Sequence, residues 1–409
     1  MPARFTVGID VALHTHRIAV LGPDGEACGS SFTIAATTEG VSSLRATLQA
    51  RGAHPAHTIV GLEATGHMWE NLEAGLTTLG YSVVVLNPLQ TRRFRDVLRR
   101  KAKTDDIDAH VIAGLLRSGA ASACYVPDEP IQSLRELARL RARLMRERQD
   151  YLRQLAAQLD VVFPAHQATL GDLSTARARG ILRAFPTARH LAQATPRAIR
   201  HAAATAGARG FSLEAAAAVH AAARQSLYSG KAAEARGHVV RTLVHQTERL
   251  TAALDDLDRT MQALLPSGDP IGGPSDADLL QTLPGVGPHT AAMLLGEIGR
   301  FQRFTSPRAL VAYVGFFPVL HQSGEYTATP HLSHAGSRIA RHVLYLAAVN
   351  AVRRTAEWRA LYRRKTAQGK TAKQALIVVA VRLLHTAYAM LKHRHPYDAN
   401  RIAMVATAT

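Results

Sequence analysis

The sequence predicts an α/β domain at the N-terminus followed by a mostly helical remainder. Two observations predict this fold class. Short apolar runs alternate with helix-type patterns across residues 5–87, and apolar residues recur at seven-residue intervals in two later segments. A stretch rich in proline and glycine, 266–275, then precedes a third portion with helical periodicity. The chain is therefore expected to combine one mixed domain with a long helical arm and a helical C-terminal domain.

The N-terminal elements follow from short apolar runs and turn residues. The expected strands cover 5–12, 17–21, 31–34, 58–63 and 81–87, and the expected helices cover 38–51 and 68–79. The first three strands are separated by turn chemistry, including Pro23-Asp24-Gly25, and predict a meander. Strands that alternate with helices indicate a sheet covered on both faces.

The helical arm is predicted by heptad spacing. Pro127–Pro130 is read as a linker, and residues 131–163 are strongly helical. In a later segment, seven-residue spacing links Val240, Thr247, Leu254 and Met261, and also Leu243, Leu250, Leu257 and Leu264. Such a coiled-coil seam can form an antiparallel hairpin within one chain or can join two chains, and the spacing fits both. Residues 165–232, rich in alanine, predict a helical insertion within this arm.

Composition points to a polyanionic partner. The 409 residues carry a formal charge of +18, and the isoelectric point is about 10.6. A protein this basic most often binds nucleic acid. The two cysteines, Cys28 and Cys124, form no CxxC pair, which favours a reducing compartment and argues against a zinc ribbon. The N-terminus runs directly into a strand pattern, and no apolar run approaches the ~20 residues of a membrane span, so we expect a cytoplasmic protein.

Four acidic residues stand out in the N-terminal portion. Asp10 lies inside an apolar strand and Glu63 ends another, although an unpaired buried carboxylate costs several kcal/mol. Asp105 and Asp108 are spaced i and i+3, so on a helix they share one face, whereas Asp106 points elsewhere. Neighbouring carboxylates repel unless a cation lies between them, and oxygen ligands suit Mg²⁺ or Mn²⁺. The plainer interpretations are helix capping for the aspartates and salt bridges for Asp10 and Glu63.

A cationic run precedes the aspartate pair. It also includes Arg95, and the residues that we expect to contact nucleic acid are Arg92, Arg93, Arg99, Arg100, Lys101 and Lys103. A second candidate contact is Leu283-Pro284-Gly285-Val286-Gly287 between two helical patterns, as in a helix-hairpin-helix element. Gly285 and Gly287 would let backbone N–H groups approach a phosphate, and the next helix adds its positive end. The alternative is an ordinary helix–helix turn. Gly369-Lys370-Thr371 lacks the glycine that would complete a P-loop, and is only a fragment.

Three segments together resemble a known family. Val7-Gly-Ile-Asp10, Gly61-Leu-Glu63-Ala-Thr-Gly66 and Lys103-Thr-Asp105-Asp-Ile-Asp108-Ala look like the RuvC-like (RNase H-fold) domain of the DEDD transposases. These form the insertion-sequence "one-ten" family, which includes the Piv-type DNA invertases. The resemblance implies that Asp10, Glu63, Asp105 and Asp108 are catalytic and bind Mg²⁺ or Mn²⁺.

The C-terminal portion resembles the same family. A helix-hairpin-helix followed by a Gly-hydrophobic-x-Pro … Ser-Gly segment implies that Ser323 is the nucleophile, whereas most Ser-Gly pairs are simply turns. Two positions depart from the family pattern. Glu325 stands where the family has a glycine, and Ser333-His334-Ala335-Gly336 replaces Ser-Lys-Arg-Gly. Arg338 and Arg341 are expected to compensate as phosphate contacts.

The expected organisation is a RuvC-like DEDD domain (1–126), a coiled-coil arm with the insertion (127–265) and a C-terminal transposase domain (275–395). The resemblance implies a recombinase that cuts and rejoins DNA through a phosphoserine intermediate, with donor and target DNA, a guide RNA encoded by the element, and a dimer or tetramer as partners. Two rivals are a metal-dependent RuvC-like nuclease or junction resolvase that uses water, and a non-enzymatic nucleic-acid-binding protein.

Overall fold

The structure is a computed structural model, and it describes residues 4–98, 104–265, 273–319, 322–323, 326–327, 331–332 and 336–399. The chain divides into two compact units, Met1–Val126 and Pro127–Thr409, which are described separately.

The first unit is an α/β domain whose sheet has the order β3-β2-β1-β4-β5. Strands β1, β2 and β3 pair antiparallel, and β1, β4 and β5 pair parallel. The expected strands and helices of this region are confirmed within a few residues at each end. In chain order the elements are β1 (Phe5–Val11), β2 (Thr15–Leu21), β3 (Phe32–Ala35), α1 (Thr38–Ala50), η1 (Pro55–His57), β4 (Thr58–Glu63), α2 (Glu70–Thr78), β5 (Ser82–Leu86), α3 (Pro88–Val97) and α4 (Asp105–Arg117).

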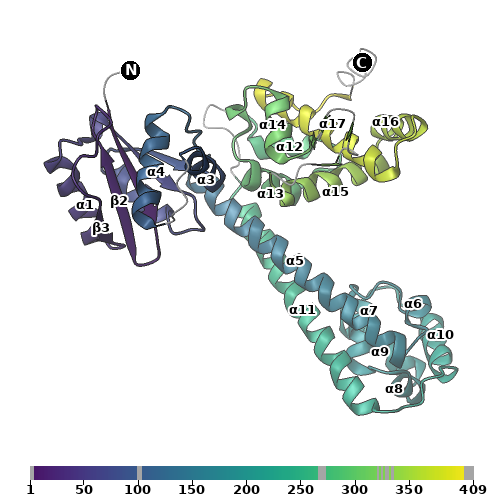
Figure 1. Cartoon of the computed structure of the whole chain (residues 1–409). Coiled ribbons are helices and arrows are strands. Elements are labelled where there is room, and N and C mark those ends of the chain that lie inside the picture. Colours follow the sequence, from purple (N-terminus) through teal and green to yellow (C-terminus); the bar gives the residue numbers. More distant parts are fainter. Residues whose placement is uncertain are drawn as a thin grey trace. The chain divides into compact units, whose positions relative to one another are not determined.

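Helices cover both faces of this sheet (Figure 1). On one face, Ile9 and Leu62 pack against Leu44 and Leu48 of α1. On the other face α4 lies directly on the central strands, where a Cβ atom at Gly8 would come within 2.0 Å of the Ala109 carbonyl oxygen. Glycine in this strand therefore lets the helix backbone approach the sheet.

In its described residues the second unit is helical, apart from four strands of two residues each. In chain order its elements are α5 (Glu129–Val162), α6 (His166–Thr169), α7 (Ala176–Ala184), α8 (Ala188–Gln193), α9 (Pro196–Thr205), α10 (Leu213–Arg224), α11 (Ala233–Ala263), α12 (Asp276–Thr282), α13 (Pro288–Ile298), η2 (Phe301–Arg303), α14 (Pro307–Val314), β6 (Pro318–Val319), β7 (Gln322–Ser323), β8 (Tyr326–Thr327), β9 (His331–Leu332), α15 (Arg338–Arg354), α16 (Ala356–Ala367) and α17 (Ala372–His393). The sequence did not predict these strands, which pair as β6 with β9 and β7 with β8.

Helices α5 and α11 pack against each other within one chain (Figure 1). Arg141 pairs with Asp258 at 2.6 Å, and Arg148 contacts Thr251 at 3.5 Å, so the two helices run antiparallel. Val240 and Thr247 of the heptad seam are fully buried, whereas Leu264 at the end of α11 is exposed. Among the two arrangements that the spacing allowed, the structure has the hairpin.

The two ends of this hairpin join different hydrophobic cores. Leu155 and Leu159 of α5 and Leu243 of α11 pack with helices α7, α8, α9 and α10, which form the insertion. At the other end, Leu134 and Met261 pack with the helices of the C-terminal portion. The insertion is thus a separate small core carried at one end of the arm.

One prediction about linkers is wrong in part. Pro127–Pro130 is not a free linker, because α5 begins at Glu129 and Pro130 lies in its first turn. Proline is tolerated there since a first-turn N–H has no helical partner. Most of the stretch 266–275 lies outside the described residues.

Helix α17 corrects another expectation. Among the described residues, α17 is long and apolar enough to span a membrane. Half of its most apolar stretch, however, is buried inside the protein. Val379, Leu383 and Leu384 belong to the C-terminal core. Its apolar character is thus accounted for by packing.

Candidate active site

Two acidic residues end neighbouring parallel strands. The last register pair of β1 and β4 is Ile9 with Leu62, so Asp10 and Glu63 are the next residues of the two strands. Both side chains are partly exposed. Because parallel strands end at one edge of a sheet, Asp10 and Glu63 lie close together at this edge.

Both acids face helix α4. Gly8 and Gly61, two residues earlier in each strand, lie against α4, and a Cβ atom at Gly61 would come within 2.8 Å of Ile112. Residues two apart in a strand point to the same face. Asp10 and Glu63 therefore lie on the face that α4 covers.

The first turn of α4 carries the aspartates. Thr104 is the N-cap, and its hydroxyl accepts a hydrogen bond from the Ile107 N–H at 3.3 Å. Asp105 is exposed, whereas Asp108 is buried and pairs with Arg95 of α3 at 2.8 Å. The negative charge at this helix start is also favoured by the helix dipole.

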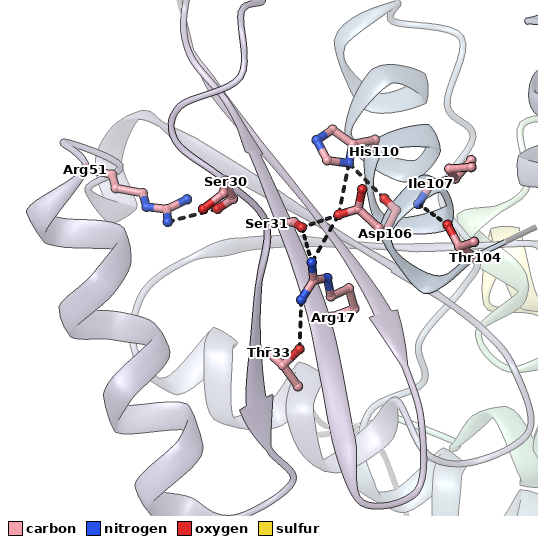
Figure 2. A network of polar contacts seen from close by, with 9 residues as sticks. All are labelled: Arg17, Ser30, Ser31, Thr33, Arg51, Thr104, Asp106, Ile107 and His110. Carbon is pink, nitrogen blue, oxygen red and sulfur yellow. Dashed lines mark hydrogen bonds and ion pairs between the residues drawn. The ribbon is translucent and has the colours of Figure 1, made fainter.

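Asp106 is the centre of a polar network that ties α4 to the sheet (Figure 2). It accepts a short hydrogen bond from Ser31 and contacts Arg17 at 3.4 Å. Arg17 also donates to Thr33 at 3.1 Å, and it is the register partner of Asp10. The hydrogen bond from Ser31 lowers the pKa of Asp106 below its ordinary value, and His110 and Arg17 act in the same direction.

Glu63 is held by two threonines. The Thr65 hydroxyl donates to Glu63 Oε1 at 2.9 Å, and the buried Thr91 makes a short hydrogen bond to Oε2. The Thr91 hydroxyl also lies 2.9 Å from the Pro88 carbonyl oxygen. The first turn of α3 therefore fixes the carboxylate of Glu63.

Sequence reasoning missed several of these partners. Arg17 and Ser31 contact Asp106 although both lie far from it along the chain. Thr91 contacts Glu63, which is also distant in sequence. Arg95 and its partner Asp108 are closer together in the sequence. No local spacing connects residues 75 positions apart, such as Ser31 and Asp106. A prediction that β1 and β4 are parallel neighbours could have brought Asp10 and Glu63 together, but it contains no information on the other partners.

The residues at this edge have the chemistry of a divalent-cation site. Carboxylate oxygens suit Mg²⁺ or Mn²⁺, and two of the four acids are strand neighbours. Within the described parts of the chain, however, no group of three or more His, Cys, Asp or Glu side chains is arranged around one point. Arg95 here supplies the positive charge beside Asp108.

The predicted basic contacts divide into three groups. Arg92 and Arg93 of α3 and Arg338 of α15 are exposed. Arg341 is tied to the end of α14, because it donates to the Val314 carbonyl oxygen at 2.9 Å. The remaining members, Arg99, Arg100, Lys101 and Lys103, lie outside the described residues.

The two glycines between α12 and α13 differ in their surroundings. Gly285 has φ +86°, and a Cβ atom there would lie 2.2 Å from the Ala347 carbonyl oxygen of α15. Gly285 is therefore required by helix packing, independently of any phosphate. Gly287, the N-cap of α13, has open space around it.

Ser323 lies in the second unit. Its backbone pairs with Tyr326 in the β7–β8 hairpin. Gly324, Glu325 and the segment Ser333–Ala335 lie outside the described residues. Gly336 follows with φ +84°, and a Cβ atom there would lie 2.5 Å from the carbonyl oxygens of Tyr313 and Val314.

A buried carboxylate lies beside the α13–α15 contact. Glu297 of α13 accepts a hydrogen bond from the Arg139 Nε at 3.1 Å and a short one from the hydroxyl of Ser337, the N-cap of α15. The sequence offered no signal for Glu297, because it lies in an otherwise apolar helix.

Comparison with known proteins gives two family models. The DEDD transposase model of the IS110 group matches residues 7–164, and the transposase model of the IS116/IS110/IS902 family matches residues 277–363. The "Mini-circle putative transposase for IS117" of Streptomyces coelicolor is 28% identical over 96% of this chain and 95% of its own length. The "Pilin gene-inverting protein" of Moraxella bovis is 33% identical over 30% of this chain and 38% of its own length.

A structural comparison gives RuvC of T. thermophilus in complex with a Holliday junction substrate. The TM-score is 0.21 and the identity 16%, over 30% of this chain and 99% of that one.

The matched segments and the acidic edge define a transposase or site-specific recombinase. Within that class, the chain belongs to the IS110 family of transposases.

Proposed function

We propose that this transposase cuts and rejoins DNA strands with a Mg²⁺-dependent acidic centre in a RuvC-like first unit and with Ser323 as nucleophile. The observation that carries the proposal is the placement of Asp10 and Glu63 on adjacent strand ends, on the face covered by α4. Asp105 and Asp108 stand in the first turn of the same helix.

The four acids would hold the cation. A divalent ion supplies charge stabilisation for the attacked phosphate and orients it. The chain's own residues prepare this edge: Thr65 and Thr91 fix Glu63, and Thr104 begins α4 at the aspartates. Arg95 supplies the positive charge beside Asp108.

Ser323 would conserve the energy of the phosphodiester. Its Oγ forms a bond to phosphorus while the bond from phosphorus to the leaving deoxyribose oxygen breaks, and the serine proton ends on that oxygen. The hydroxyl of a second strand then attacks the phosphoserine and restores the serine, so no external energy source is needed. The match of residues 277–363 to a transposase model supports this assignment, because it contains Ser323.

The partners follow from the family resemblance and from the charge. Donor and target DNA would be the substrates, a guide RNA encoded by the element would specify them, and a dimer or tetramer would bring the acids and Ser323 together. The helix-hairpin-helix of α12 and α13 would contact the DNA backbone near Gly287, where the N-terminus of α13 is open. The charge of +18 supports binding to phosphate backbones.

Trapping the covalent intermediate tests the nucleophile. The protein is incubated with Mg²⁺, the RNA and the DNA ends of its element, and is then denatured. We expect a protein–DNA adduct that maps to Ser323, is absent in Ser323→Ala, and persists in Ser43→Ala, which changes an exposed serine of α1.

Two outcomes would contradict the proposal in different ways. If Ser323→Ala still cleaves DNA at the wild-type rate, water is the nucleophile, and the protein acts as a metal-dependent nuclease or junction resolvase. If replacing the acids leaves every activity intact, the protein only binds nucleic acid.

A further inference from the structure

The densest positive charge of the described C-terminal portion lies around α16. Residues 353–373 contain eight Lys or Arg and one acid, whereas the insertion 165–232 spreads nine Lys or Arg and two acids over a much longer stretch. We name the exposed cations of this stretch the α16 basic surface: Arg353, Arg354, Arg363, Arg364, Lys370 and Lys373.

The opposite face of α16 fixes the helix to the core. Trp358 is 1% exposed, and its Nε1 donates to the Tyr397 hydroxyl at 3.1 Å. Tyr397 in turn donates to Glu357 at 3.0 Å, so the single acid of the stretch is engaged by the core side. Arg359 donates to the Arg353 carbonyl oxygen at 2.7 Å and closes the end of α15. Within the described residues, no acid pairs with Arg354, Arg363 or Lys370.

The exposed face of α16 has a narrow crest of small side chains. Ala356, Ala360 and Ala367 are all exposed, and at 100° per residue they lie within about 40° of one another. On the same helical wheel Arg363 lies on one side of this crest and Arg364 on the other. The helix therefore presents a slim apolar ridge with one arginine on each side of it.

The turn after α16 extends this charge. Gly369 has φ +84°, and Thr371 caps α17 through a capping box with Gln374. The segment Gly369-Lys370-Thr371, which resembles part of a P-loop, is therefore a helix cap, and it holds Lys370 and Lys373 exposed at the start of α17.

We propose that the α16 basic surface binds duplex DNA, with the alanine crest against the major groove and the cations on phosphates of both strands. The major groove of B-DNA is wide enough for an α-helix, whereas that of A-form RNA is too narrow. Arginines and lysines directed at phosphates contact the backbone and carry no sequence information directly. This inference rests on the proposed function only in taking DNA as the substrate.

Binding is measured by fluorescence anisotropy on a random-sequence DNA duplex in EDTA, at several salt concentrations, with the full chain. The variant Arg354→Gln/Arg363→Gln/Lys370→Gln removes three cations of the surface. Since each phosphate contact contributes about 0.9 to the salt slope, we expect the slope to fall by about 2.7 and the affinity at 0.1 M salt to fall by about 500-fold.

A matched variant separates contact from net charge. Arg197→Gln/Arg200→Gln/Arg224→Gln removes the same charge from exposed positions of the insertion, and we expect its salt slope to stay near the wild-type value. Equal losses in the two variants, or no loss in the first, would overturn the proposal.

The crest has its own test. Ala360→Trp adds bulk without charge on the exposed face, and it is expected to weaken binding to the DNA duplex while leaving binding to an RNA duplex unchanged. An unchanged DNA affinity, or tighter wild-type binding to the RNA duplex, would contradict major-groove docking. Circular dichroism melts check that each variant is folded. Because no cleavage is measured, these results are independent of the role of Ser323.

Discussion

Asp106 has a structural role that sets it apart from the two proposed cation ligands of the same helical turn, Asp105 and Asp108. Its partners Ser31 and Arg17 lie on the β2–β3 side of the sheet, whereas Asp108 pairs with Arg95 of α3. The first turn of α4 is thus held from two directions, which leaves Asp105 exposed between them. Of the three aspartates in this turn, Asp106 therefore anchors α4 to the sheet, and Asp105 and Asp108 are the two candidate ligands for a cation.

The anchor should be visible in the pH dependence of stability. Because the pKa of Asp106 is lowered in the folded state, its contribution is present above the unfolded value of about 3.9 and is lost as the pH falls through the folded value. Its side chain is 48% exposed, so solvent screening limits the effect of Asp106→Asn to about 0.5–1 kcal/mol at pH 7. Urea unfolding at pH 7 and pH 3 checks this: the difference from wild type should shrink at pH 3, and a constant difference would contradict it.

Asp105 should matter for chemistry and little for stability. Asp105→Asn is expected to lower the rate of DNA cleavage by at least ~100-fold, since it removes a proposed cation ligand, with a nearly unchanged melting temperature. The control Glu39→Gln removes a charge from exposed α1, on the opposite face of the sheet, and should cleave normally. Full cleavage by Asp105→Asn would remove this residue from the site.

At the scale of elements, the contact of α4 with β1 positions the acids. Gly8→Ala would place a Cβ atom 2.0 Å from the Ala109 carbonyl oxygen, so α4 must move away from the sheet. We expect a loss of about 1–3 kcal/mol in the free energy of unfolding and a loss of cleavage. Gly75→Ala in α2 is the control, because its Cβ would lie 3.6 Å from Val41, an ordinary contact. A Gly8→Ala variant with wild-type stability would show that the packing is looser than described.

The junction of α5, α11 and α13 contains a pH-sensitive group. His289 lies 2.8 Å from Asp258, which also binds Arg141, and burial together with Arg141 lowers the pKa of His289. Stability from neutral His289 is present above its unfolded pKa of about 6.5 and is lost as the pH falls below it. Arg141→Gln should raise the pKa of His289 in an NMR titration, and an unchanged or lower value would contradict this electrostatic account.

The sequence predicted most elements because their patterns are local. Alternating apolar runs located β1, β4 and β5, and heptad spacing located α11. The placement of Asp10 and Glu63 in strands also followed from these runs, whereas the pairing of the two strands is known only from the structure. Contacts such as Ser31 with Asp106 depend on which loops meet in space, and the packing role of Gly285 depends on α15, so local patterns contain neither. The two-residue strands β6 to β9 are too short for any periodicity.

For the molecule as a whole, the acids lie in the first unit and Ser323 in the second. The hairpin of α5 and α11 belongs to the second unit, together with the C-terminal core that contains α16. A reaction that uses both units therefore requires functional acids in the first and a functional Ser323 in the second. Cation binding by the acidic edge can be measured separately, before any DNA is added.

The most direct test is a Mn²⁺ titration of the full chain followed by electron paramagnetic resonance, which separates free from bound ion. We expect saturable Mn²⁺ binding by the wild-type protein and by Glu39→Gln, and loss of that binding in Asp10→Asn. Equal Mn²⁺ binding by Asp10→Asn and the wild-type protein would contradict the claim that this acidic edge is the catalytic centre.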